Sequence, residues 1–209
     1  MIITQDNIRD LLKAITEDFE KNKEELCGYD RAIGDGDHGD SMARGTRDGY
    51  AAVAALPEES SVFECIKVYS RTMLATIGGA IGPIFSTVIM ELGRAAKATN
   101  QIGAAEYAAG LKKAAEKVMD LGGAQVGDKT LVDALVPAAE AAEANSGKSL
   151  EELAVLVEKA AGEGVASTIP MQAKMGRSHF LREKSVGHQD AGATSLHYML
   201  RTISTFVNN

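Results

Sequence analysis

Apolar residues recur along most of the chain at the spacing of helices. In residues 5–24, an apolar stripe falls at i, i+3, i+4, i+7 and i+11, formed by Ile8, Leu11, Leu12, Ile15 and Phe19. This spacing places the side chains on one face of an amphipathic helix. No segment shows the alternation of apolar and polar positions that is typical of a half-buried strand. The pattern therefore predicts an all-α protein.

The same reasoning predicts seven further helices, separated by polar or glycine-rich connections. They cover residues 41–56, 57–77, 82–99, 103–121, 127–145, 149–166 and 191–206. No repeat, low-complexity tract or shift in composition marks a linker, so we expect residues 1–209 to form a single domain. Consecutive helices joined by short connections run antiparallel, which favours a bundle or a closed helical barrel.

Five connecting stretches are rich in glycine and charge, and the helix order predicts where they lie. They are "DRAIGDGDHGDS", "IGGAIGP", "LGGAQVGDKT", "MGRSHFLREKSVG" and "GHQDAGATS". The first three follow the first, third and fifth predicted helices, and the last two lie between the seventh and eighth. Because antiparallel helices place every second connection at the same end, we expect all five stretches to meet at one end of the bundle.

Charge and composition exclude several classes of function. The net charge of −7 argues against nucleic acid as a partner. The uncharged segment 72–90 approaches the length of a membrane span, but glycines and Pro83 interrupt it, so no membrane span is expected. Cys27 and Cys65 show no metal-binding spacing, and residues 1–15 lack the features of a signal peptide. We therefore expect a cytoplasmic protein with reduced thiols.

The first connection contains a candidate metal site. Asp30, Asp35 and Asp37 place three carboxylates within eight residues, and hard oxygen ligands suit Mg²⁺. Three carboxylates exceed what one such ion usually takes from protein, so two ions are plausible; the alternative is a set of capping aspartates in a solvated turn. His38 follows directly and could serve as a metal ligand, as a general base beside Asp37, or as a hydrogen-bonding residue against a ligand.

The remaining connections supply candidate anion-binding groups. The glycine pairs at 78–79 and 122–123 each precede a predicted helix, whose first N–H groups can bind anions; an ordinary helix C-cap has the same sequence. Asp190 is expected to cap the last helix, with Gly192 near its start. Arg177 lies in a basic loop and could pair with the aspartates or hold a phosphate. No Walker-type loop, dinucleotide fingerprint or Ser-His-Asp arrangement is present.

Four segments in this order, "IGDGDHGDSMARG", "GGAIGP", "GDKTLVDAL" and "MGRSHFLREKSVGHQDAGATS", resemble the nucleotide-binding L subunits of dihydroxyacetone kinases. The similarity extends over essentially the whole chain. It implies an eight-helix antiparallel up-and-down barrel that holds ADP or ATP at one end, bridged through two Mg²⁺ ions to Asp30, Asp35 and Asp37. The implied nucleotide contacts are His38, Gly39, Asp40, Ser41, Met42, Gly79, Ala80, Gly122, Leu131, Arg177, Asp190, Ala191 and Gly192, with Arg177 also the catalytic residue.

The resemblance also implies a phosphotransferase that acts as part of a complex. In the phosphotransferase-system form of this glycerone kinase, a phosphohistidine-carrying M subunit rephosphorylates the bound ADP, and the γ-phosphoryl group passes to dihydroxyacetone on a partner K subunit. The alternatives are a nucleotide-loaded module that binds a transcription regulator, and an ATP-dependent kinase subunit for another keto-sugar. A second copy of the chain is a further candidate partner.

Three positions depart from the usual pattern of the L subunits. Ser41 stands where asparagine is common, Ile81 where serine is frequent and Ala191 where proline is common. None of these changes removes an implied metal ligand. They leave the natural keto-sugar and the phosphodonor open.

Overall fold

The computed structural model describes residues 1–209, and its regular structure is helical. It contains eight α-helices and one 3₁₀-helix: α1 (Ile8–Ile33), α2 (His38–Ala54), α3 (Val62–Thr76), α4 (Ile81–Ala95), α5 (Ala104–Gly122), α6 (Val132–Ala144), α7 (Leu150–Thr168), the 3₁₀-helix (Arg177–Ser185) and α8 (Ala191–Asn208). The only β-type pairing is an isolated bridge between Ile3 and Ile102. The prediction of an all-α protein is confirmed.

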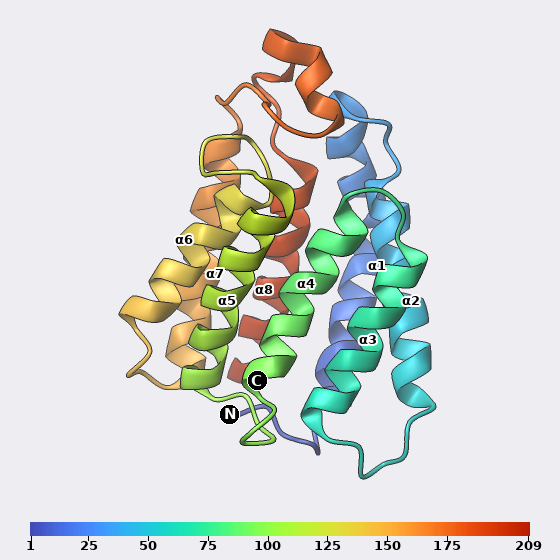
Figure 1. The fold of residues 1–209 in the computed structure, drawn as a ribbon, viewed down its shortest axis with the longest axis vertical. Coiled ribbons are helices and arrows are strands. Elements are labelled where there is room, and N and C mark those ends of the chain that lie inside the picture. The colour runs from blue at the N-terminus through green and yellow to red at the C-terminus, as the bar shows by residue number, and fades with distance from the viewer.

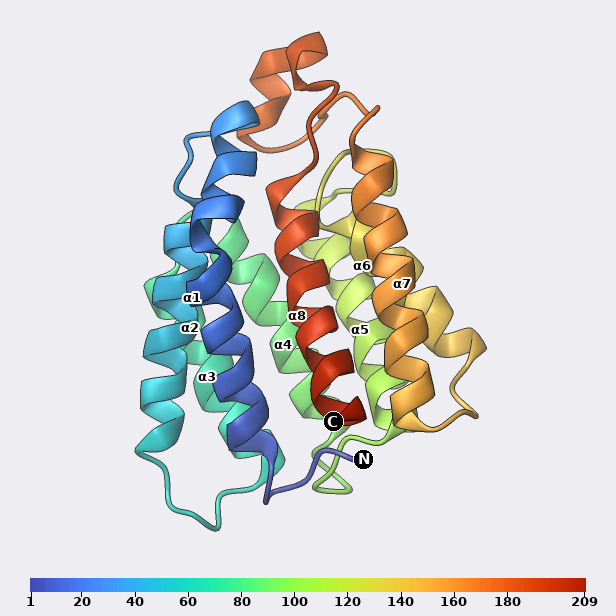
Figure 2. The ribbon, with the colours of Figure 1, turned by 180° about the vertical axis from the view of Figure 1, so that it is seen from behind.

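The α-helices form a closed circuit of neighbours. Each helix packs against the next along the chain, and α8 packs against α1, the order expected of the up-and-down barrel. Figures 1 and 2 show both termini at one end and the connections α1–α2, α3–α4, α5–α6 and α7–α8 together at the other. The expectation that the five glycine-rich stretches meet at one end is therefore confirmed.

The core is built mainly from aliphatic residues and alanine, and glycines allow some helices to approach each other closely. A single cluster of 48 buried residues draws on all eight α-helices. A Cβ at Gly39 would overlap the carbonyl oxygen of Lys23, and one at Gly164 would overlap that of Asp133. The pairs α1–α2 and α6–α7 thus pack backbone against backbone at these points.

The acidic stretch predicted as a loop from residue 30 is largely helical. The helix expected over residues 5–24 extends to Ile33, and α2 begins at His38 rather than at residue 41. The apolar stripe pauses after Phe19 and then resumes with Leu26, Cys27 and Ile33, all buried. Asp30 therefore lies in the last turn of α1, and only residues 34–37 separate it from α2.

The glycine pair at 122–123 ends the helix predicted over residues 103–121, which confirms the C-cap alternative rather than the anion-binding start of the next helix. Gly122 ends α5, and Gly123 adopts a left-handed conformation with φ of 67° while its N–H donates to the Met119 carbonyl (2.7 Å). This is the common way to end a helix. The next helix, expected from residue 127, begins only at Val132.

The uncharged segment 72–90 is divided between two helices. α3 ends at Thr76, and α4 begins at Ile81 after a turn in which Gly79 has a φ of 69°. None of the helices combines the length and the apolar character that a membrane crossing requires.

Candidate functional site

A cavity of about 530 Å³ opens at the end of the bundle where the glycine-rich connections meet. Its walls come from the α1–α2, α3–α4 and α5–α6 connections, from the segment before α8 and from the start of α8. Its volume lies within the range of small-molecule sites. One cavity thus draws on all the connections that the sequence had singled out.

Most residues proposed as ligands line this cavity. They are Asp30, Asp35, Asp37, His38, Ser41, Gly79, Ala80, Gly122, Leu131, Arg177, Asp190, Ala191 and Gly192. Three other proposed nucleotide contacts do not line it: Gly39 faces α1, Met42 is buried in the core and Asp40 is exposed. The N–H groups of Gly39 and Asp40 form no hydrogen bond within the chain, as is normal in the first turn of a helix.

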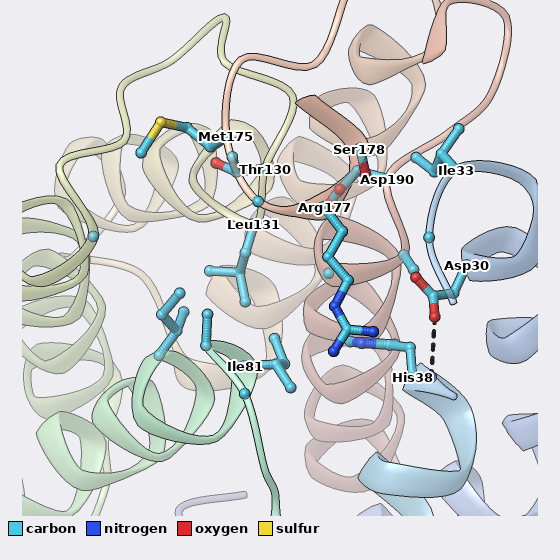
Figure 3. Close-up of a pocket in the computed structure, with 18 of the residues that line it drawn as sticks. Asp30, Ile33, His38, Ile81, Thr130, Leu131, Met175, Arg177, Ser178 and Asp190 are labelled. Atoms are coloured by element: carbon cyan, nitrogen blue, oxygen red, sulfur yellow. Dashed lines mark hydrogen bonds between the residues drawn. The ribbon is translucent and has the colours of Figure 1, made fainter. Parts of the chain in front are cut away.

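The three aspartates converge at the α1–α2 connection. Carboxylate oxygens of Asp30, Asp35 and Asp37 lie within 4.8 Å of one another. The N–H groups of Gly36 (2.8 Å), Asp37 (3.0 Å) and His38 (3.3 Å) all donate to Oδ2 of Asp30, and Figure 3 shows the bond from His38. The chain thereby fixes the Asp30 carboxylate before any ligand binds.

This cluster has the chemistry of a divalent-cation site. Three carboxylates at this spacing repel one another unless a positive charge neutralises them. The guanidinium of Arg177 forms an ion pair with Asp35. The carboxylate cluster thus already binds one positively charged group. The donors are all hard oxygens with no thiolate beside them, which suits Mg²⁺. The donor set therefore fits the metal that the sequence implies.

His38 faces the same region in its neutral form. Its side chain is buried, and its Nε2 has no hydrogen-bond partner. Burial lowers the pKa of His38 to about 4, and the negative charge of Asp30 only partly opposes this shift. This nitrogen is buried as well as unpaired, and no hydrogen bond links the ring to Asp37, the partner in the general-base interpretation.

The opposite wall of the cavity is apolar. Figure 3 shows Ile81, Leu131 and Met175 across the cavity from Asp30 and His38. Ile84, Val118 and Val132 extend this surface. The cavity thus suits a ligand with one flat apolar part and one anionic part that a cation can bridge to the aspartates.

The predicted cap of the last helix is confirmed. Asp190 accepts a hydrogen bond from the Ala193 N–H (2.8 Å), and its own N–H donates to Thr168 Oγ1 (3.0 Å). Burial raises the pKa of Asp190 to about 6, with the charge of Asp133 contributing and that of Lys129 opposing. Ala191, where proline is common in the L subunits, is the first residue of α8 and is buried.

Two charged residues in the α5–α6 region were missed from the sequence. Asp133 is buried and accepts hydrogen bonds from the N–H groups of Gly127 (2.6 Å) and Thr130 (2.7 Å), which folds residues 127–130 into a tight turn. Lys129 is also buried and has a φ of 60°. A threonine followed three residues later by an acidic residue is typical of the start of a helix, and α6 indeed begins just after Thr130; the pattern does not indicate that residues 127–129 form a turn before it.

Comparison with known proteins places these features in context. The model of the DAK2 domain matches residues 32–205. The ADP-binding subunit DhaL of the PEP-dependent dihydroxyacetone kinase of Escherichia coli (strain K12) is 34% identical over 207 residues, which cover 98% of each chain. The D-erythrulose kinase of Mycolicibacterium smegmatis is 33% identical over 197 residues, covering 93% of this chain and 34% of that protein.

A solved structure shares the fold. The dihydroxyacetone kinase from C. freundii, crystallised in complex with AMP-PNP and Mg²⁺, superposes with a TM-score of 0.74 at 20% sequence identity. The match covers 95% of this chain and 33% of that one. The helical arrangement described above is therefore that of a known domain.

Proposed function

The chain belongs to the DAK2 domain family, and from this premise we propose that it is the ADP-binding subunit of a multi-subunit dihydroxyacetone kinase. The observation that carries the proposal is the cavity in which three converging carboxylates face an apolar wall. Its support from relatives is the similarity to an ADP-binding subunit along nearly the whole of both chains. The activity is phosphotransfer, performed within a complex.

In this proposal each part of the cavity has a separate task. Ile81, Leu131 and Met175 receive the adenine ring, while Asp30, Asp35 and Asp37 hold two Mg²⁺ ions. When bound, these ions neutralise the phosphate charge that the acidic cluster would otherwise repel. Arg177, now paired with Asp35, is close enough to exchange that contact for a phosphate oxygen and to stabilise the charge on the transferred group.

We propose two successive phosphoryl transfers. In the first, the phosphorus–nitrogen bond of a phosphohistidine protein breaks and a terminal oxygen of ADP takes the phosphoryl group. In the second, the bond to the γ-phosphorus breaks and a hydroxyl oxygen of dihydroxyacetone, held on a partner K subunit, takes the group and releases its proton. Neither step needs a nucleophile from this chain, whose residues orient the nucleotide and exclude water.

A kinase subunit for another keto-sugar is the second candidate. The D-erythrulose kinase is nearly as similar in sequence as the E. coli subunit. This chain matches only 34% of that protein. In this proposal the choice of sugar lies with the partner that binds the sugar and not with this chain. Ile81 lines the cavity but lies on its apolar wall, so its departure from serine bears on the nucleotide rather than on the sugar.

The test is to identify what the protein carries and what recharges it. Protein purified without added nucleotide is denatured, and the released compounds are separated by chromatography. We expect about one ADP per chain, and conversion of that ADP to ATP on addition of a phosphohistidine donor of the phosphotransferase system. Release of no nucleotide, together with no binding of added MgADP, would refute the function.

A further inference from the structure

One segment of the cavity wall is a long loop with adjacent ends. Residues 169–187, here called the 169–187 loop, leave the bundle after α7 and return just before α8. The Gly187 N–H donates to the Ile169 carbonyl (2.8 Å) and closes the loop at its base. The loop carries Met175, Arg177 and Ser178 into the cavity, and Figure 3 shows the Arg177 side chain reaching down from it.

Lys129 joins the two ends of this loop. Its Nζ donates to the carbonyl of Thr168 (2.6 Å) and to the carbonyl of His188. Thr168 immediately precedes the 169–187 loop and His188 immediately follows it. A single ammonium group, contributed by the α5–α6 connection, thus bridges both ends of the loop.

The surroundings of Lys129 fix both its side chain and its backbone conformation. Its side chain is 1% exposed, and an ammonium group is rarely buried unless it is fully hydrogen-bonded. Its φ of 60° is unusual for a residue other than glycine, and such conformations persist only where the surroundings determine them. Burial lowers the pKa of Lys129, and the negative charges of Asp190 and Asp133 oppose that shift.

Lys129 also lines the cavity, but the hydrogen bonds of its ammonium group go to the backbone of this chain. Both partners of its Nζ are backbone carbonyls. These contacts fix the two ends of the 169–187 loop, and Arg177 extends from this loop to Asp35.

We propose that Lys129 is a positioning residue that clamps the two ends of the 169–187 loop and thereby holds Arg177 over the acidic cluster. The effect on nucleotide binding rests on the proposed function, whereas the clamp itself does not. Lys129→Met keeps an unbranched side chain one atom shorter than lysine and removes both hydrogen bonds, leaving two carbonyls without their donor.

Two other lysines provide matched controls. Lys174 lies in the same loop, where its N–H donates to the Asp128 carbonyl (3.1 Å) and its Nζ pairs with the Asp128 carboxylate (3.0 Å), but its side chain is 61% exposed. Lys159 lies on α7 with an exposed partner, Glu163. Lys174→Met should loosen the loop less than Lys129→Met, and Lys159→Met should leave it unchanged.

The clamp is tested by amide hydrogen exchange followed by NMR, without nucleotide. In Lys129→Met we expect the Gly187 amide to exchange about tenfold faster, while amides in the centres of α4 and α5 keep their protection. Unchanged exchange at Gly187 would overturn the proposal. So would a uniform loss of protection through all helices, because Lys129 would then support the whole fold rather than the loop.

The positioning role is tested by the dissociation rate of MgADP in a double-mutant cycle. We expect Lys129→Met to raise this rate about tenfold in the wild-type background and less than about twofold when Arg177→Met is already present. Equal effects in both backgrounds would refute an action through Arg177. Gly187→Ala, strained at a φ of 92°, opens the same base without touching Lys129 and should show the same dependence on Arg177.

The two proposals fail in distinguishable ways. If the wild-type protein binds no MgADP, the proposed function is wrong, while the hydrogen-exchange result at Gly187 still decides whether Lys129 clamps the loop. If MgADP binds and the cycle shows no coupling between Lys129 and Arg177, the proposed function stands and the positioning role is refuted.

Discussion

Asp30, Asp35 and Asp37 carry equal charges, but the chain holds them to different degrees. Three N–H groups fix Asp30 in the last turn of α1. Asp35 and Asp37 are exposed, and the side chain of Asp35 is paired only with Arg177. In the proposed site, Asp30 therefore provides a preset ligand, and the other two adjust when a cation arrives.

Asp35→Asn tests the exposed part of this cluster. The change removes one negative charge and the ion pair with Arg177, so we expect Mg²⁺-dependent affinity for ADP to fall by about 100-fold. Thermal unfolding without nucleotide should change little, because surface ion pairs contribute about 1 kcal/mol or less. Isothermal titration with and without Mg²⁺ measures the effect.

The matched control for this variant is Asp48→Asn. Asp48 is also exposed and pairs with Arg47 on α2, but it does not line the cavity. Its affinity for MgADP should equal that of the wild type. An unchanged affinity in Asp35→Asn as well would show that Asp35 is not a metal ligand.

The raised pKa of Asp190 makes stability depend on pH. Between the ordinary pKa of 3.8 and about 6, the folded chain keeps a proton on Asp190 that the unfolded chain has released. The contribution of this proton to the free energy of unfolding is therefore complete below pH ~4 and is lost as the pH rises through 6. Asparagine caps a helix about as well as aspartate does, so Asp190→Asn removes the titration and retains the cap.

We therefore expect the wild type to lose about 2 kcal/mol of unfolding free energy relative to Asp190→Asn between pH 4 and pH 7. Urea denaturation of both proteins in EDTA, at one-unit intervals of pH, measures the difference. A difference that stays constant across this range would show that Asp190 titrates normally.

The α1–α2 pair places the acidic cluster, and its geometry depends on Gly39. A Cβ at this position would overlap the Lys23 carbonyl oxygen and press on Cys27 Sγ (2.9 Å). We expect Gly39→Ala to lower the free energy of unfolding by about 2–3 kcal/mol, as overpacking against an immovable backbone does. Thermal and urea unfolding measure the loss.

Gly28→Ala is the matched control on α1, since a Cβ there meets nothing within 4 Å. It should stabilise the protein by about 0.5–1 kcal/mol, because alanine favours a helix more than glycine does. If both variants changed stability alike, close packing would not be the reason for Gly39.

The helices could be predicted from sequence because each buries one apolar stripe. The prediction falls short where the stripe is interrupted: residues 20–25 of α1 are all polar, and the last nine residues of α1, which include Asp30, lie outside the helix predicted over residues 5–24. At Gly122 and Gly123 the sequence left two interpretations open, because a glycine pair can end one helix or precede the next. Only the backbone conformation distinguishes the two.

At the scale of the molecule, the site was predictable because the number of helices fixes which connections share an end. The individual contacts were not. No periodic pattern indicates that the Lys129 ammonium reaches the carbonyls of Thr168 and His188, or that Gly39 faces α1 instead of the cavity. Such contacts depend on distances between segments far apart in sequence.

Nucleotide binding at this end should stabilise the whole bundle, since the cavity is built from four separate connections. Relative to protein stripped of its nucleotide, ADP at about 100 Kd with Mg²⁺ adds about 2.7 kcal/mol, or a rise in Tm of about 5–10 °C. Differential scanning fluorimetry should show this rise, and it should be abolished by EDTA. AMP, which lacks the diphosphate, should produce a much smaller rise; an equal rise with AMP would exclude a role for the metal-bridged phosphates.

The central claim is that the converging carboxylates of α1 and the α1–α2 connection hold divalent cations together with the phosphates of a nucleotide. Crystals grown with MnCl₂ and ADP, measured with anomalous diffraction, test it most directly. We expect anomalous peaks among the carboxylates of Asp30, Asp35 and Asp37, with the diphosphate on their other side and the adenine against Leu131. Nucleotide bound elsewhere, or these three side chains turned to solvent with no metal between them, would contradict the claim.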